Sequence, residues 1–233
     1  MNPIHIIHMR PMQQLLSKAE PGILFATMLA PRISYSVKAD AAQVAGSIPT
    51  AYRRLHLLES IGLATVRRGE FKINRAVLQP PHVLEKLVPS LLALKMARRF
   101  GRKYHVSDIN FLKNNLPENS FITLDYKAWE LTKYQLPQDL YVYVDDIDKA
   151  SNFLKSKGFS NGNSGHVVLL QKQDDSKNII EQVYLDCIAK GGRNILDAIA
   201  IELKHGDKLN IKGKFSIDDI LKVQDDMRTL KVE

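Results

Sequence analysis

The sequence contains one cysteine, Cys187, and no long apolar run. A single cysteine cannot form a disulfide within the chain and has no partner for a cysteine-based zinc site. No stretch of 18 or more apolar residues occurs, and the first ten residues, MNPIHIIHMR, lack the long apolar core of a signal peptide. Internal repeats and low-complexity tracts are also missing. We therefore expect a cytoplasmic protein without a membrane partner, in which Cys187 is a small core residue.

The length and the charge distribution indicate two different halves. A chain of 233 residues, 45% of them hydrophobic, is long enough for two domains with their own cores. Residues 1–105 contain 16 Lys and Arg against 5 Asp and Glu, a net charge of +11, whereas the rest contains 17 against 20, a net charge of −3. A local positive field favours phosphate backbones. Basic residues can also merely keep a surface soluble, but their coincidence with the motif described next predicts a nucleic-acid partner.

Residues 36–74 carry the most informative pattern. Small apolar residues over 41–45 predict a short helix, Gly46 can adopt the positive φ of a turn, and Ser47 is a good N-cap for a second helix. In that second helix apolar residues recur at steps of three or four and predict a buried stripe, namely Ile48, Ala51, Leu55, Leu58 and Ile61. Gly62 is expected to end the helix. The pattern predicts a helix, a tight turn and a second helix.

Two short β-prone runs follow, over residues 63–66 and 71–73. The intervening Arg67, Arg68, Gly69 and Glu70 predict a hairpin with a basic tip. Upstream, Pro21 is expected to open a helix that Pro31 closes, and residues 33–36 can supply a small third strand.

These ordered parts resemble a winged helix-turn-helix, and the phrase TAYRRLHLLESIGLATVRRG is close to the stretch that such regulators carry from recognition helix to wing. The resemblance implies a sequence-specific, double-stranded DNA-binding transcription regulator. The residues expected nearest the DNA are Ser47, Thr50, Tyr52, Arg53 and Arg54 on the helix and Arg67 and Arg68 at the wing. A winged helix used only for protein contacts is a further alternative, which an acidic face would favour; this face is basic.

We expect the winged domain to span residues 1–79, a linker helix residues 80–104, and an α+β domain residues 105–233. The linker helix is expected to end in four cations, Arg98, Arg99, Arg102 and Lys103, which suit a helix C-terminus. They either touch DNA phosphates or form a solvated helix end. The apolar side of this helix could support a homodimer that reads two half-sites.

Residues 105–233 alternate between helical and strand patterns. We expect strands over 140–144, 165–171 and 182–189, and helices over 120–134, with a strand-like entry, 147–157, 194–204 and 216–230. The run GFSNGNSG follows a helix instead of opening one, so a flexible turn is expected there and not a phosphate site. The resulting small mixed sheet resembles a degenerate minimal nucleotidyltransferase fold.

The carboxylates of this half do not complete a nucleotidyltransferase site. Such enzymes need a Gly-Ser turn for the triphosphate and three acidic residues on adjacent strands for two metal ions. Asp139 and Asp186 could mimic the first and third, but Tyr141 stands where the second belongs, and the glycine turn is missing. Asp146 or Asp148 is expected to cap a helix. We therefore predict no catalytic residue, cofactor or metal site; the alternative is a nucleotidyltransferase or nucleotide-binding enzyme with an appended DNA-binding domain.

Two longer phrases, VYLDCIAKGGRNILDAIAIEL and YVYVDDIDKASNFLKSKGF, follow the N-terminal pattern. Together they resemble the antitoxin-type regulators of abortive-infection toxin–antitoxin systems, especially the archaeal forms. The resemblance implies a repressor whose partners are double-stranded DNA and a cognate toxin protein. It also implies that the second domain handles a partner or DNA and is not a catalyst. Gly191, Gly192 and Arg193 could receive an anion at a helix N-terminus; a tight connector is the expected role.

Overall fold

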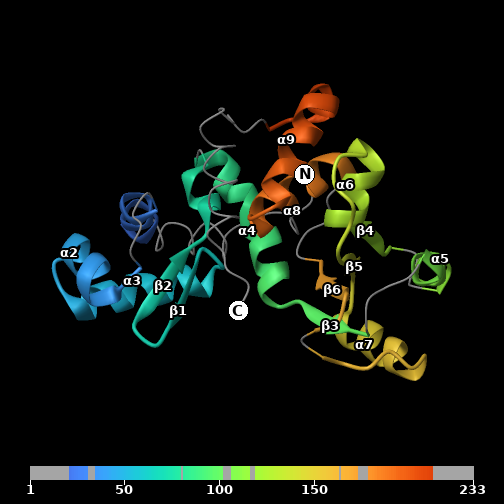
Figure 1. Ribbon diagram of the computed structural model, residues 1–233, viewed down its shortest axis with the longest axis horizontal. Helices are drawn as coiled ribbons and strands as arrows, with labels where there is room; N and C mark the ends of the chain where they lie inside the picture. Colours follow the sequence, from blue (N-terminus) through green and yellow to red (C-terminus); the bar gives the residue numbers. More distant parts are fainter. Residues whose placement is uncertain are drawn as a thin grey trace, which may run out of the picture. The chain divides into compact units, whose positions relative to one another are not determined.

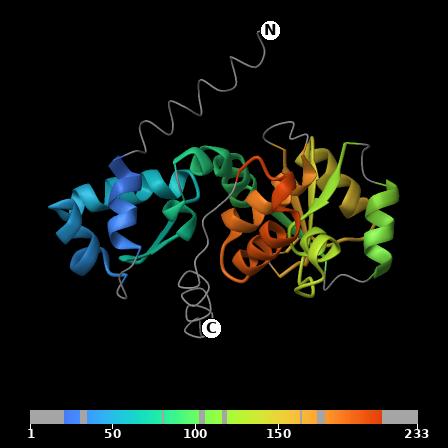
Figure 2. The ribbon, with the colours of Figure 1, turned by 90° about the horizontal axis from the view of Figure 1, so that it is seen from above.

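The computed structural model is a mixed α+β protein, as the sequence predicts. It describes residues 21–30, 35–79, 81–101, 106–115, 119–162, 164–172 and 178–211. The chain forms two compact units, unit 1 (Met1–Leu91) and unit 2 (Leu92–Glu233), each with its own sheet. Figures 1 and 2 show the elements of both. No helix in the described ranges is long and apolar enough to cross a membrane.

Unit 1 contains the predicted succession of short helices. A helix covers residues 21–29, and the π-helix η1 (Val37–Ala41) continues directly into α2 (Ala42–Ala45). Gly46 ends α2 with a φ of 84°, a conformation that glycine adopts without steric cost. The helix α3 (Ile48–Ser60) then begins at Ser47, whose side-chain oxygen accepts a hydrogen bond from the Thr50 amide at 3.3 Å. The predicted turn and N-cap are therefore confirmed.

A two-stranded hairpin follows α3, as predicted. The strands β1 (Ala64–Arg67) and β2 (Glu70–Ile73) pair antiparallel across a two-residue turn. Both turn residues have positive φ, 47° for Arg68 and 84° for Gly69, as type I′ turns require. The expected third strand is reduced to a single bridge between Ser36 and Glu70; residues 31–34 lie outside the described part.

The core of unit 1 lies between these helices and the inner face of the hairpin. The predicted stripe of α3 is buried at four of its five positions, and only Ile48, in the first turn, is 39% exposed. Other buried apolar residues of unit 1 lie in the preceding helices, the hairpin and the first part of α4, and include Phe25, Leu29, Val37, Ala41, Leu63, Phe71, Ile73, Val83 and Leu87. The α3 register predicted from spacing is therefore the one that packs.

The predicted linker helix is shorter than expected. After the 3-10 turn η2 (Arg75–Leu78), the helix α4 runs over Pro81–Lys95 and contains Pro89. Arg98 and Arg99 do not belong to its C-terminus, because they lie in the strand β3 (Arg98–Phe100), which pairs with a sheet of unit 2. The expected basic helix end is wrong at these two positions; Arg102 and Lys103 lie outside the described residues.

Unit 2 is built on a four-stranded mixed sheet with the order β3-β6-β5-β4. The strands β5 (Leu140–Val144) and β6 (Val167–Gln171) are parallel, while β3 and β4 (Phe121–Thr123) run antiparallel to their neighbours at the two edges. All five residues of β5 are buried. Burial on both faces is why this strand reads as a continuous apolar run.

Helices cover both faces of this sheet (Figure 2). The helices α5 (Val106–Asn115) and α7 (Ile147–Ser156) pack on the face that carries Leu140, Val142 and Val144. On the other face lie α6 (Leu124–Thr132), α8 (Ile179–Lys190), α9 (Asn194–His205) and the short 3-10 turn η3 (Gly206–Lys208). This second face carries the titratable groups described below.

The strand predicted over residues 182–189 is wrong, because this segment belongs to α8. Eight of the twelve residues of α8 are buried, among them Val183, Tyr184 and Cys187. A helix buried on most sides lacks the polar face that reveals helical periodicity, so its aromatic and β-branched residues read as a strand. The expected core position of Cys187 is confirmed. The predicted helix over 216–230 lies outside the described residues.

Candidate functional site

The polar residues of α3 differ in how they are held. Ser47 and Thr50 bond to each other, since the Ser47 hydroxyl donates to the Thr50 hydroxyl at 3.0 Å besides accepting from its amide. Arg53 is exposed near the middle of the helix, on the side opposite the buried stripe. Arg53 is therefore the cation of α3 that solvent reaches most freely.

Arg54 occupies a different environment from Arg53. Its guanidinium carbon lies 5.5 Å from the centroid of the Phe25 ring, and its side chain is half-buried. This cation–π contact joins α3 to the helix of residues 21–29. The structure thus gives Arg54 a packing partner within unit 1 that the sequence did not indicate.

Tyr52 of α3 lies beside the turn of the hairpin. Its ring stacks on that of His56, with centroids 5.9 Å apart. A Cβ atom at Gly69 would lie 3.8 Å from the Tyr52 hydroxyl. The backbone of the turn is also hydrogen-bonded to η1, because the Val37 amide donates to the Gly69 carbonyl at 2.9 Å. The hairpin turn therefore lies close to α3 and is hydrogen-bonded to η1.

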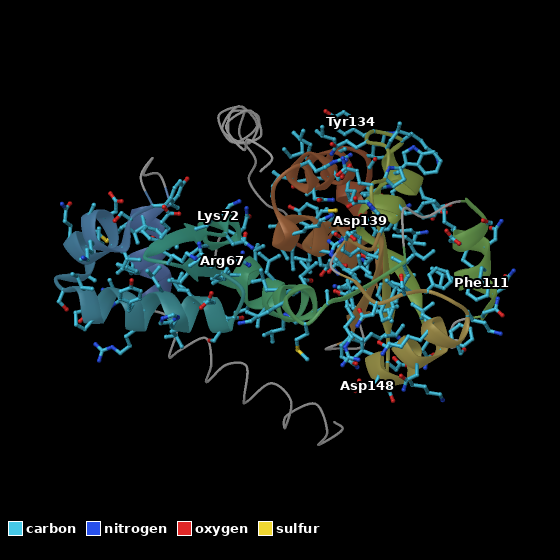
Figure 3. The ribbon with its side chains drawn as sticks, turned by 60° about the horizontal axis from the view of Figure 1, so that its bottom comes forward. Arg67, Lys72, Phe111, Tyr134, Asp139 and Asp148 are labelled. Carbon is cyan, nitrogen blue, oxygen red and sulfur yellow. The ribbon has the colours of Figure 1, made fainter. Side chains whose placement is uncertain are left out.

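The outer face of the hairpin is polar and mostly basic. Cross-strand pairing places Thr65 opposite Lys72 and Arg67 opposite Glu70 on this face, and all four are exposed. Arg68 is exposed in the turn, and Figure 3 shows Arg67 and Lys72 on the hairpin. With Lys38 and Arg53, five exposed cations lie within residues 35–74.

The acidic residues of the same segment are fewer and mostly engaged. Asp40 accepts a hydrogen bond from the Ser36 amide at 3.0 Å. Glu59 accepts from the Val66 amide at 3.0 Å and lies 3.1 Å from a ring nitrogen of His56. Glu70 is the exposed acid of this segment, opposite Arg67. The net field of the α3 and hairpin surface is positive, which suits an anionic polymer.

The two carboxylates compared above with a nucleotidyltransferase site lie in different environments. Asp139 precedes β5 and accepts hydrogen bonds from Arg99 and Tyr141, both at 3.0 Å, while a His166 ring nitrogen lies 2.7 Å away. Asp186 lies in α8 and not on a strand. It is fully buried and accepts from Thr123, Tyr143 and Gln182. Within the described residues no cluster of His, Cys, Asp and Glu is arranged to hold a metal ion.

The acidic cluster after β5 has structural partners. Asp146 caps α7 as predicted, since its side chain accepts from the Lys149 amide at 2.9 Å. Asp145 pairs with Lys172 at 2.9 Å, and Asp148 pairs with Arg98 at 2.7 Å. The helix-capping interpretation is therefore confirmed for Asp146.

A buried polar network on α6, α8 and α9 was not predicted from the sequence. One oxygen of Asp125 accepts from Lys190 and Asn194, both at 2.8 Å, and the other accepts from the amides of Gln138 and Asp139. Burial opposes ionisation of Asp125, but the charge and hydrogen bond of Lys190 outweigh it and lower the carboxyl pKa. These residues are far apart in the sequence, so no motif spacing revealed them.

Asp197, in the first turn of α9, is incompletely hydrogen-bonded within this network. It is 2% exposed, receives a long 3.5 Å contact from Asn194, and among the described residues no hydrogen bond reaches its Oδ1 atom. Burial raises the pKa of Asp197 to about 6, and the nearby charge of Asp125 adds to this.

The connector Gly191, Gly192 and Arg193 precedes the first turn of α9 and joins two helices, not a strand and a helix.

Replacing Asp197 with asparagine is expected to stabilise unit 2 above pH 6. The folded pKa exceeds that of an unfolded aspartate, so ionisation costs stability as pH rises from about 4 to 6, and the cost is complete above pH 6. Asp197→Asn should raise the free energy of unfolding by about 1 to 3 kcal/mol at pH 8 and by much less at pH 4. Urea unfolding at pH 8 and pH 4 measures the free energy of unfolding of both proteins. An equal gain in stability at the two pH values would contradict the raised pKa of Asp197.

Comparisons of the chain with protein-family models, with curated proteins and with solved structures found no match.

Proposed function

We propose that unit 1 is a winged helix-turn-helix and that the protein is a sequence-specific, double-stranded DNA-binding regulator of the repressor type. The observation that carries the proposal is the exposed basic surface formed by α3 and the outer face of the hairpin. Two elements of different shape, a helix and a hairpin, contribute cations to one small unit. That combination suits a helix in the major groove and a hairpin along the adjacent backbone.

The proposed contacts differ among the basic residues. Arg53, exposed on α3, is placed to reach a base edge, where a bidentate contact with guanine would discriminate sequences. Arg67, Arg68 and Lys72 on the hairpin suit phosphate contacts, which position the protein without reading sequence. Arg54 stays a proposed DNA contact, although its guanidinium also lies against Phe25.

The repressor role and a cognate toxin partner rest on the sequence resemblance to antitoxin-type regulators. In the described residues of unit 2, no feature favours the nucleotidyltransferase alternative. Asp139 and Asp186 have separate sets of hydrogen-bond partners, and Asp186 is fully buried. Neither carboxylate is arranged with the other to hold a shared metal ion in the described part of the chain.

Substitution of Arg53 and of Arg67 should affect DNA binding in different ways. Arg53→Ala is expected to lower discrimination between a preferred duplex, selected from a random pool, and scrambled DNA by about 1 to 3 kcal/mol. Arg67→Ala should weaken binding to both duplexes similarly and reduce the salt slope by about one unit. Fluorescence anisotropy over several salt concentrations measures both effects.

Lys155→Ala provides the matched control, since it removes one exposed positive charge from α7 in unit 2. It should leave affinity, discrimination and salt slope within error of the unmodified protein. Circular dichroism confirms that each variant is folded. If folded Arg53→Ala and Arg67→Ala proteins bound DNA as the control does, the α3 and hairpin surface would not be the DNA-binding face.

A further inference from the structure

Unit 2 contains a cavity of about 410 Å³ on the sheet face that carries α8. Its volume falls in the range of about 300 to 1,000 Å³ that is usual for small-molecule sites. All the lining residues belong to unit 2, and they are Leu94, Ala97, Arg99, Tyr141, Val168 and Lys190. We propose that this cavity binds a small organic anion, a carboxylate or a phosphate monoester with an apolar part, a property that goes beyond DNA binding and does not depend on it.

The charge on the cavity wall is positive. Two cations, Arg99 and Lys190, line the cavity, and among the described residues no acidic side chain does. The side chains of Arg99 and Lys190 are 36% and 24% exposed, against 14% and 2% for their partners Asp139 and Asp125, neither of which lines the cavity. The cations are therefore more accessible than their counter-charges.

Both cations are also held in position before a ligand arrives. Arg99 donates from one terminal nitrogen to Asp139 and to the Gly165 carbonyl, both at 3.0 Å, and from the other to the Tyr141 hydroxyl at 3.3 Å. Lys190 is 2.8 Å from Asp125 and 4.3 Å from the centroid of the Tyr141 ring. Fixed donors lose little conformational freedom when an anion binds, which favours affinity.

Lys190 also remains charged in this setting. Burial alone would lower its pKa, but the charge of Asp125 raises the pKa of Lys190 above its ordinary value. A guanidinium and an ammonium together supply charge-assisted hydrogen bonds to an oxyanion.

The apolar lining of the cavity indicates what else the ligand carries besides its anionic group. Leu94, Ala97 and Val168 give the cavity an apolar side, and the Tyr141 ring adds an aromatic surface. Inorganic phosphate alone would leave this side in contact with water. The lining therefore fits an anion that carries a small apolar or aromatic group.

Isothermal titration calorimetry of the full chain tests this site with defined probes. Benzoate and phenyl phosphate represent the two anion types, inorganic phosphate lacks the apolar part, and benzyl alcohol and benzylamine replace the anion by a neutral and a cationic group. Saturable 1:1 binding of benzoate or phenyl phosphate is expected, at least about tenfold tighter than that of benzyl alcohol or inorganic phosphate. The stronger of the two anions identifies the ligand type.

Three variants separate the cavity from the rest of unit 2. Arg99→Gln should weaken the preferred anion roughly 10- to 100-fold through the loss of a charge-assisted hydrogen bond. Arg98→Gln is the matched control, because the adjacent strand residue points to the opposite face, where it bonds to Asp148 and Ser151. It should bind within about twofold of the unmodified protein. Ala97→Phe, which narrows the cavity without changing charge, should also weaken binding.

Circular dichroism establishes that these proteins are folded. The proposal is overturned if neither anion binds the folded protein, if benzyl alcohol binds as tightly as the anions, or if Arg98→Gln loses as much affinity as Arg99→Gln. If Arg99→Gln fails to fold, Ala97→Phe decides, since an unchanged anion affinity in that variant would place the site elsewhere. None of these measurements uses DNA, so failure of the DNA-binding proposal would leave them unaffected.

Discussion

Replacing Gly165 by alanine is expected to lower the free energy of unfolding of unit 2 by about 3 kcal/mol. A Cβ atom at this position would lie only 2.5 Å from the carbonyl carbon and oxygen of Phe100 and 2.6 Å from its nitrogen. These are backbone atoms of β3, held on one side by pairing with β6 and on the other by a bridge to Asn161. They cannot rotate away, so β3 or the loop before β6 must move.

Gly162→Ala is the matched control for this prediction. Gly162 lies three residues earlier in the same loop, and a Cβ atom there would meet nothing within 4 Å. Its substitution should change the free energy of unfolding by less than about 1 kcal/mol. Urea unfolding followed by tryptophan fluorescence reports on unit 2, because Trp129 in α6 is the single tryptophan of the chain. Equal stability of the two variants would refute the close approach of Gly165 to β3.

Replacing Asp125 by alanine is expected to destabilise unit 2 by about 3 to 5 kcal/mol at pH 7. The carboxylate is 3% exposed and accepts four hydrogen bonds, from Lys190, Asn194 and the amides of Gln138 and Asp139. Its removal leaves the partly buried ammonium of Lys190 without its carboxylate partner. Two backbone amides also lose their acceptor, which adds to the cost.

Asp148→Ala is the control for Asp125→Ala, because Asp148 is also paired with a cation but its side chain is 78% exposed. An exposed pair contributes little, so this variant should lose at most about 1 kcal/mol. Urea unfolding at pH 7, monitored by Trp129 fluorescence, measures both. A cost for Asp125→Ala no greater than that for Asp148→Ala would mean that the buried pair does not support unit 2.

The Asp125 contribution should also depend on pH with a definite sign. Its folded pKa lies below that of an unfolded aspartate, so the stabilisation is complete above about pH 4 and is lost as pH falls through the folded value. The stability gap between the unmodified protein and Asp125→Ala should therefore be constant from pH 7 to 5 and narrow at lower pH. Asp197, whose pKa is raised, has the opposite dependence.

The elements of unit 1 were predictable from sequence because each is specified by neighbouring residues. Gly46 ends α2, Ser47 caps α3, and Arg68 with Gly69 forms the hairpin turn, all within a few positions of the element concerned. The spacing of the apolar residues fixed which side of α3 is buried, and hence that Arg53 is exposed. The same spacing could not distinguish Arg54, whose contact with Phe25 depends on how two helices pack.

In unit 2 the sequence determined the strand β5 and the capped helix α7, whose signals are equally local. Tertiary structure alone decided that residues 98–100 become an edge strand, because pairing with β6 is available there. It also decided that residues 182–189 are helical, because burial removes the polar face that would reveal the helical period. Gly165 and Gly162 look alike in sequence and differ only in what lies beside them. Asp125 bonds to Lys190 and Asn194, 65 and 69 positions away, and the cavity beside Lys190 is lined by residues from Leu94 to Lys190. Such contacts arise only when the chain folds back on itself.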